Sequence, residues 1–123
     1  MANTKFFFIS RLKNIGYASK GAWLLLKTEA SIQIQCSIAI LITIAGFYYD
    51  ISAMEWIFQI MAIGLVISTE GLNTAIEKLS DFIHPEYHRK IGFIKDVSAG
   101  SVFFAALFAI TVGLIIYLPK ILG

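Results

Sequence analysis

The chain is 123 residues long, of which 58% are hydrophobic and 15% are charged, and its mean hydropathy is +0.77. This composition is far more apolar than that of a soluble globular chain and indicates one membrane domain. The net charge of +2 is too small to favour nucleic acid as a partner, and the single cysteine, Cys36, excludes a disulfide framework and a cysteine metal site.

The first segment, residues 5–29, mixes aromatic and aliphatic side chains with lysine and arginine. Its apolar residues recur at helical spacings, which predicts a basic amphipathic helix lying along the cytoplasmic interface of a membrane. Trp23 suits the headgroup level, and Gly16 and Gly21 are candidate points at which the helix breaks into two pieces. An anchor without any chemical role is the alternative interpretation of this segment.

Three later segments, residues 32–49, 54–72 and 97–118, have the composition of membrane spans. A transmembrane helix needs about 20 mainly apolar residues, with a range of about 17–25. Residues 50–53 allow only a tight turn, and Ser52 followed by Glu55 matches a capping box that begins the second span. The expected fold is therefore all-α and integral to the membrane, with three transmembrane helices and an amphipathic N-terminal interfacial helix in one domain, residues 1–123.

Lysine and arginine are distributed unevenly around these spans. The turn near residue 50 has none, and the segment after the third span has only Lys120. By the positive-inside rule, we expect the N-terminus and the loop of residues 78–96 in the cytoplasm, and the turn and the C-terminus on the far side. The basic residues that decide this are Lys5, Arg11, Lys13, Lys20, Lys27, Lys78, Arg89, Lys90 and Lys95.

Four polar residues lie where the second span leaves the lipid: Glu70, Asn73, Glu77 and Asp81. Steps of three and four residues place them on one face of a helix, as an acidic stripe. Ionisable groups at or near the bilayer core are costly and usually functional. The stripe is therefore predicted to bind a hard cation or to take a proton. A solvated helix end that carries structural polar groups is the alternative.

The third span carries Ser101, Ala105, Ala109 and Gly113, four residues apart. Small residues at this spacing let helix backbones approach closely in lipid. They predict contact between copies of the chain or packing within one copy, and the spacing does not separate the two.

Glu29 ends the first helix on the same side of the membrane as Glu77. Carboxylates without His or Cys neighbours suit magnesium, which takes one or two carboxylates and completes its shell with water and phosphate. Lys95 and Asp96 open the third span on that side, where the lysine offers a point charge for phosphate. Glu70 lies about 10 Å deeper than Glu77, a depth that suits a base acting on a hydroxyl at the lipid interface. These groups are the ingredients of phosphoryl transfer.

The chain has no phosphate-binding glycine loop of the P-loop or protein-kinase type. His84 and His88 are four residues apart, but Pro85 between them favours a helix start over a pair of helical metal ligands.

The segment EGLNTAIEKLSDFIHPEYHRKIGFIKDVSAGS, residues 70–101, closely resembles the signature of the small prokaryotic diacylglycerol kinase family, which includes undecaprenol kinases. Upstream, Gly16-Tyr17, Lys20-Gly21 and Glu29-Ala30 fit as well, so the resemblance covers nearly the whole chain. It implies three spans with an interfacial helix, a homotrimer with active sites shared between subunits, and a place in the bacterial cytoplasmic membrane. The residues in the family's order and spacing are Glu70, Asn73, Ala75, Ile76, Glu77, Asp81, Glu86, Tyr87, His88, Lys95, Asp96 and Ala99.

The resemblance also implies residue roles in a lipid kinase that uses ATP and Mg²⁺. Glu70 corresponds to the catalytic base, Glu29 and Glu77 to the metal ligands, and Asn73 to a polar residue beside the reacting groups, with Asp81 in support. Positions around the nucleotide correspond to Tyr17, Glu29, Glu77, Glu86, Tyr87, His88, Lys95 and Asp96. Lipid contacts correspond to Asn14, Ile15, Gly16, Tyr17, Ala18, Ser19, Trp23, Leu24, Leu25, Leu26, Ser31, Ile32, Gln33, Ile34, Gln35, Glu70 and Ala99.

Two positions depart from the family pattern. The diacylglycerol-type enzymes have an arginine where this chain has Ser10, so either Arg11 replaces it after a small shift or that nucleotide contact is absent. The acidic residue sometimes found at the position of Gln35 is also missing. Diacylglycerol is the expected acceptor and undecaprenol the alternative. Enzymes for the two lipids differ in the lipid slot and share the phosphoryl machinery, so the motif does not discriminate between them.

Two other classes of protein remain as alternatives. A small transporter would carry charges towards the far side of the membrane, but residues 56–69 are uncharged. A structural anchor would have no use for a pair of costly glutamates.

Overall fold

The computed structural model describes residues 2–123 and consists of helices joined by short connections. They are α1 (Ala2–Thr28), α2 (Ala30–Tyr48), α3 (Ala53–Ile83) and α4 (Arg89–Leu122). The last three are long and apolar enough to cross a membrane. The prediction of an all-α integral membrane fold is confirmed.

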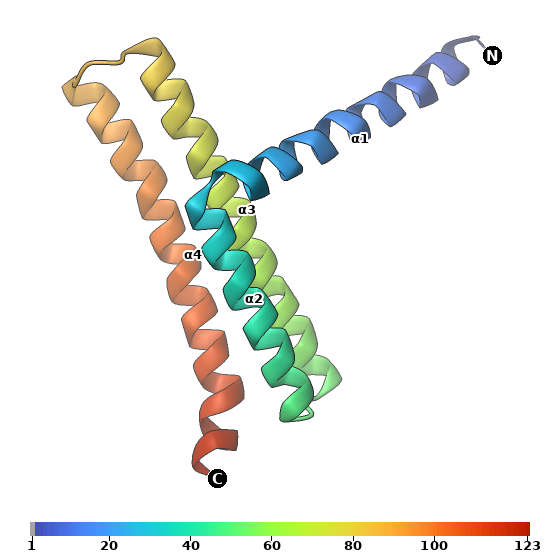
Figure 1. Cartoon of the computed structure of the whole chain (residues 1–123), viewed down its shortest axis with the longest axis vertical. Coiled ribbons are helices and arrows are strands. Elements are labelled where there is room, and N and C mark those ends of the chain that lie inside the picture. The colour runs from blue at the N-terminus through green and yellow to red at the C-terminus, as the bar shows by residue number, and fades with distance from the viewer. Residues whose placement is uncertain (1) are drawn as a thin grey trace.

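Helix α1 leaves the bundle at a wide angle to α2, α3 and α4 (Figure 1). It is continuous through Gly16 and Gly21, so the predicted break into two pieces is wrong. Neither glycine has a positive φ, and a glycine within a helix costs only about 1 kcal/mol relative to alanine. The corner between α1 and α2 is a single residue, Glu29, and Gln33 closes it by donating from Nε2 to the carbonyls of Leu26 and Lys27.

The turn between α2 and α3 forms as predicted. Asp50 adopts a left-handed conformation, φ 50°, which a short polar side chain tolerates better than most. Ser52 and Glu55 then form the capping box: the Ser52 amide donates to Glu55 Oε1 at 2.9 Å, and the Glu55 amide donates to Ser52 Oγ at 3.2 Å. The second membrane helix therefore begins at Ala53.

Helices α3 and α4 extend beyond the predicted spans of residues 54–72 and 97–118. No proline interrupts residues 72–83, so α3 carries the acidic stripe past the apolar segment. The predicted helix start at Pro85 is wrong, because α4 begins at Arg89 with His88 as its N-cap. The joined ends of α3 and α4 extend past the α1–α2 corner (Figure 1). Part of each helix therefore lies outside the apolar spans.

The interior of the single chain is small. Ile51, Ile116 and Tyr117 form its buried apolar cluster, near the α2–α3 turn. Ala105 is also buried, so one member of the small-residue row packs within the chain, whereas Ser101 is exposed. Most other large apolar side chains are exposed, as expected where lipid or another subunit provides the surroundings.

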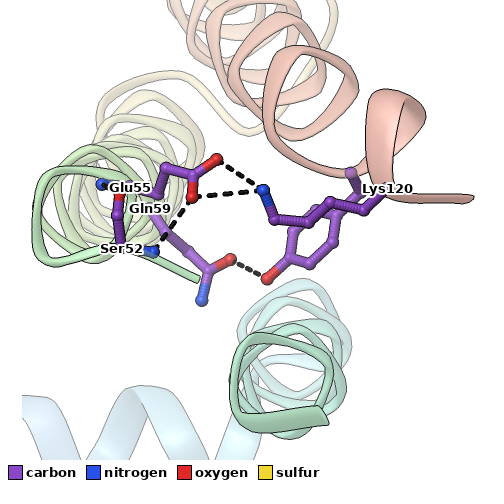
Figure 2. Close-up of polar contacts among 5 residues, drawn as sticks. Ser52, Glu55, Gln59 and Lys120 are labelled. Atoms are coloured by element: carbon purple, nitrogen blue, oxygen red, sulfur yellow. Dashed lines mark hydrogen bonds and ion pairs between the residues drawn. The ribbon is translucent and has the colours of Figure 1, made fainter. Parts of the chain in front are cut away.

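A polar network joins α2, α3 and α4 near the α2–α3 turn, and no pattern in the sequence predicts it. The Tyr117 hydroxyl of α4 lies within hydrogen-bond distance of Gln59 Oε1 on α3 and of the Ile42 carbonyl on α2. Next to it, Lys120 Nζ donates to both oxygens of Glu55, at 2.9 and 3.2 Å (Figure 2). These contacts satisfy polar groups in an otherwise apolar region.

We expect Tyr117→Phe to reduce the free energy of unfolding by about 1–3 kcal/mol, because it removes the hydroxyl that donates a hydrogen bond to the buried amide oxygen of Gln59. Gln59, which loses that donor, is 3% exposed. Tyr48→Phe is the matched control, since Tyr48 is 80% exposed. The measurement is the thermal melting temperature of each variant in the same detergent. Equal melting temperatures for the two variants would show that the network does not stabilise the fold.

Candidate active site

The acidic stripe lies on the outer half of α3, where the helix passes the α1–α2 corner. Asn73 donates from Nδ2 to Glu77 Oε1 at 3.1 Å, one helical turn away. The other polar atom of the Asn73 side chain, Oδ1, is buried and has no hydrogen-bond partner. Glu70 is half-buried on the same face. The predicted grouping of Glu70, Asn73 and Glu77 on one face of a helix is therefore present.

Glu29 reaches this part of α3 from the α1–α2 corner. It occupies the N-cap position of α2 in extended conformation, but its carboxylate makes no capping hydrogen bond. Instead, Lys78 Nζ lies 3.3 Å from Glu29 Oε1. The end of α1 also packs against α3. Leu25 lies so close to Gly71 that a Cβ atom added to this glycine would be 3.2 Å from Leu25 Cδ1. The corner thus brings a carboxylate that is distant in the sequence to the segment that carries Glu77.

The far end of the stripe contacts α4. Lys95 Nζ pairs with Asp81 Oδ1 across the two helices. The side chains are 37% and 60% exposed, so the pair is solvated and contributes little to stability by itself. The lysine that the sequence offers as a point charge for phosphate is held by a member of the stripe in this state, whereas Asp96 beside it is exposed.

The connection between α3 and α4 carries the other residues predicted to surround the nucleotide. His84 Nδ1 donates to the Glu86 carbonyl at 2.6 Å, and His88 Nδ1 accepts from the Lys90 amide at 3.1 Å. The two imidazole rings contact each other edge to face, with centroids 5.1 Å apart. Because both Nδ1 atoms are engaged with backbone, the histidines serve to shape this connection. Tyr87 is 87% exposed and its ring lies against Gly92.

A cavity of about 320 Å³ opens between α3 and α4 next to the stripe. Its polar lining consists of Thr69 and Asn73 from α3 and Ser98 and Ser101 from α4, and the rest is apolar. The space could hold a small polar group at the edge of an apolar region.

The positions predicted to contact lipid divide into two groups. On α1, Leu25 is half-buried against α3, whereas the other large side chains are exposed: Ile15, Tyr17, Trp23, Leu24 and Leu26. On α2, Ile32 is 2% exposed and packs inside the chain, whereas Ile34 is 58% exposed. Gln35 lines a second, apolar cavity of about 330 Å³ between α2, α3 and α4.

The side chains of this site suit magnesium, which water and substrate phosphate help to bind, better than a metal ion bound by protein ligands alone. Within residues 2–123, no three His, Cys, Asp or Glu side chains gather closely enough to hold an ion. Glu29 and Glu77 provide oxygen donors, and the unpartnered Oδ1 of Asn73 lies beside Glu77. Mg²⁺ is commonly bound by one or two carboxylates together with water and substrate phosphates, so this donor set fits.

Lys78 is the residue near the site that sequence reasoning missed. Its sequence signal is only that a lysine directly follows Glu77. Its contact with Glu29 depends on the angle between α1 and α2, which no local pattern specifies.

Comparison with known proteins finds one family and several relatives that the chain resembles. Residues 16–117 match the family described as prokaryotic diacylglycerol kinase. The chain is 36% identical over 109 residues to an undecaprenol kinase of Bacillus subtilis, with 89% of each chain covered. It is 32% identical over 113 residues to a diacylglycerol kinase of Escherichia coli, with 89% of this chain and 90% of the relative covered. A diacylglycerol kinase of Haemophilus influenzae is 32% identical over 89 residues, which cover 72% of this chain and 75% of the relative.

Proposed function

This chain belongs to the prokaryotic diacylglycerol kinase family and is a membrane lipid kinase with ATP as co-substrate, and we propose that Glu70, Glu77 and Glu29 carry its chemistry. In the proposed reaction, the hydroxyl oxygen of a membrane lipid bonds to the γ-phosphorus of ATP, ADP leaves, and Glu70 accepts the hydroxyl proton. Magnesium, when bound, supplies charge neutralisation for the phosphate oxygens. Positioning of the reactants dominates such transfers.

One observation carries this proposal: the ion pair between Lys78 and Glu29, at 3.3 Å. It brings the carboxylate of the α1–α2 corner to the segment of α3 that carries Glu77. In the proposal, Glu29 and Glu77 are the metal ligands, and Asn73 orients Glu77 through the 3.1 Å hydrogen bond. Glu70, seven residues before Glu77, lies on the lipid side of them, where an acceptor hydroxyl would be held.

For the nucleotide, we propose the connection between α3 and α4 together with the start of α4. Glu86 and Tyr87 are exposed there, and His88 and Lys95 flank the first turns of α4. Tyr17 and Arg11 would approach from α1, where both are exposed. The Arg11 guanidinium lies 4.9 Å from the centre of the Phe7 ring, so its charge is stacked against an exposed aromatic side chain of α1.

The lipid would lie against exposed apolar side chains of α1 and the first turns of α2, with its hydroxyl towards Glu70. Diacylglycerol is the first proposed acceptor, in keeping with the family description and with several of the relatives. Undecaprenol is the second, and one observation favours it: the undecaprenol kinase relative is 36% identical, against 32% for the diacylglycerol kinase of E. coli. The two lipids share a terminal hydroxyl and differ in the size and shape of their apolar parts.

A panel of lipid alcohols tests both proposals. Purified protein in nanodiscs is given magnesium, labelled ATP and, separately, diacylglycerol, undecaprenol, ceramide or a sphingoid base. A single strongly preferred acceptor identifies the substrate. If diacylglycerol and undecaprenol both remain unlabelled, both proposed acceptors are wrong.

We further propose a homotrimer in the bacterial cytoplasmic membrane, with active sites shared between subunits. The extensive exposed apolar surface is compatible with neighbouring subunits. So are the small residues Ala109 and Gly113, which are half-buried and line the apolar cavity. The subunit number can be measured by cross-linking in nanodiscs.

The proposed orientation has the N-terminus and the 78–96 loop in the cytoplasm. In a Cys36→Ala background, a cysteine at position 52 should react with an impermeant thiol reagent from outside intact cells, and a cysteine at position 90 should react only after lysis. Ser52 and Lys90 are both exposed, so access through the protein does not limit either reaction. The reverse pattern would contradict the topology and the access of ATP to the site.

A further inference from the structure

The carboxylate of Glu29 is neutralised within the chain itself. Its side chain is 22% exposed, and a carboxylate so withdrawn from water needs a compensating partner. Lys78 Nζ supplies the charge at 3.3 Å from Oε1, and Thr28 Oγ1 lies 3.5 Å from the same oxygen. No hydrogen bond within residues 2–123 is donated to the second oxygen, Oε2.

The two partners of this pair differ in their surroundings. The side chain of Lys78 is 70% exposed, so the ammonium group can leave Glu29 and remain solvated. Solvated lysine–carboxylate pairs are weak and readily broken. The contact can therefore hold Glu29 in the absence of a metal and still give way to a stronger cation.

A magnesium ion bound at Glu29 Oε1 would compete with the ammonium group for that oxygen. A ligand oxygen lies about 2.0–2.1 Å from Mg²⁺, which would place the ion close to the positively charged Nζ. Like charges at such a separation repel, so magnesium binding at Oε1 favours release of the ammonium group.

We propose that Lys78 is an internal counter-ion of Glu29 that a divalent cation displaces from Oε1. The inference rests on the proposed role of Glu29 as a metal ligand, and it adds a residue that sets the metal concentration the enzyme requires. The released ammonium group stays on the residue after Glu77, within the same site. Lys78 is thus a positioning residue that acts through Glu29.

A zero-length cross-linker tests the displacement directly. A carbodiimide joins Lys78 Nζ to the Glu29 carboxyl as an amide, with loss of water to the reagent, and the product is identified by mass spectrometry. We expect this cross-link in the metal-free full chain in nanodiscs, and at least a threefold loss of it on adding MgCl₂, compared with NaCl at the same ionic strength. The pair of Lys120 and Glu55, at 2.9 Å on the far side, is the internal control and should cross-link equally in both salts.

Variants of Lys78 supply a second measurement. Lys78→Gln should bind Mn²⁺, a spectroscopic probe for magnesium, about two- to fivefold more tightly in the absence of nucleotide, as expected on removing a weak competitor. Lys78→Arg should bind it as the parent does, because the charge is kept. In a Glu29→Gln background, Lys78→Gln should have no further effect.

The outcomes separate this inference from the proposed function. If Glu29→Gln weakens metal binding but MgCl₂ leaves the Lys78–Glu29 cross-link unchanged, Glu29 remains a ligand and the displacement is wrong. An equal gain from Lys78→Gln with either residue at position 29 would mean a general charge effect and would also overturn it. If Glu29→Gln leaves metal binding unchanged, the proposed ligand itself is wrong, and the inference falls with it.

Discussion

Replacing Glu70 with glutamine is expected to lower lipid phosphorylation by about 10²–10⁴-fold, the usual cost of removing a general base. Glutamine keeps the size of the side chain but cannot accept the hydroxyl proton. Nucleotide binding should stay nearly intact, because the proposed metal and nucleotide contacts are made by other residues. The fold should be as stable as before or more so, since a half-buried charge is removed from near the lipid.

The test combines a kinase assay with ATP affinity and a thermal melt on one preparation. Glu55→Gln is the matched control: it is the same substitution on the same helix, at the end near the α2–α3 turn, where Glu55 pairs with Lys120. That control should keep its activity and lose some thermal stability. Near-normal turnover in Glu70→Gln would rule out this residue as the base and leave Asp96, which is exposed at the start of α4, as the next candidate.

The membrane helices could be predicted from the sequence because their signals are local. Length and apolar composition located all three spans, and the capping box located the first turn of α3. Helix ends beyond the lipid were predicted less well. The charge pattern predicts a loop over residues 78–96, yet residues 78–83 and 89–96 are helical, because nothing between them and the spans breaks the helix. The same reason explains why Gly16 and Gly21 do not divide α1.

The acidic stripe could also be predicted from the sequence, because residues 70, 73 and 77 share a face of any α-helix. The contacts between helices could not be predicted in this way. The pairs of Lys78 with Glu29 and of Lys95 with Asp81 depend on how α1 and α4 meet α3, and no spacing within one helix specifies that. The Tyr117 network is similar, since its members are 58 and 75 residues apart in the chain. Local patterns thus indicate which residues are available, and the packing of helices decides which of them meet.

Glu77→Gln and Glu29→Gln are each expected to raise the magnesium concentration that gives half-maximal rate. Each change removes a formal charge from the proposed cation site while keeping the shape of the side chain. Losing a residue that merely supports a metal ligand typically costs about 10–100-fold in metal affinity, so losing a ligand should cost at least about tenfold. Because the site also draws on substrate phosphates, excess magnesium should partly restore the rate.

The measurement is the initial rate as a function of magnesium concentration at saturating ATP, for each variant and for Asp50→Asn as the control. Asp50 lies in the turn between α2 and α3 with a positive φ that asparagine also tolerates, so that control should leave the magnesium dependence unchanged. The two site variants should differ in one respect. Glu29→Gln also removes the partner of Lys78, whereas Glu77→Gln leaves that ion pair in place as a competitor. The larger shift is therefore expected for Glu77→Gln, and a variant with an unchanged magnesium dependence would show that its residue is not a ligand.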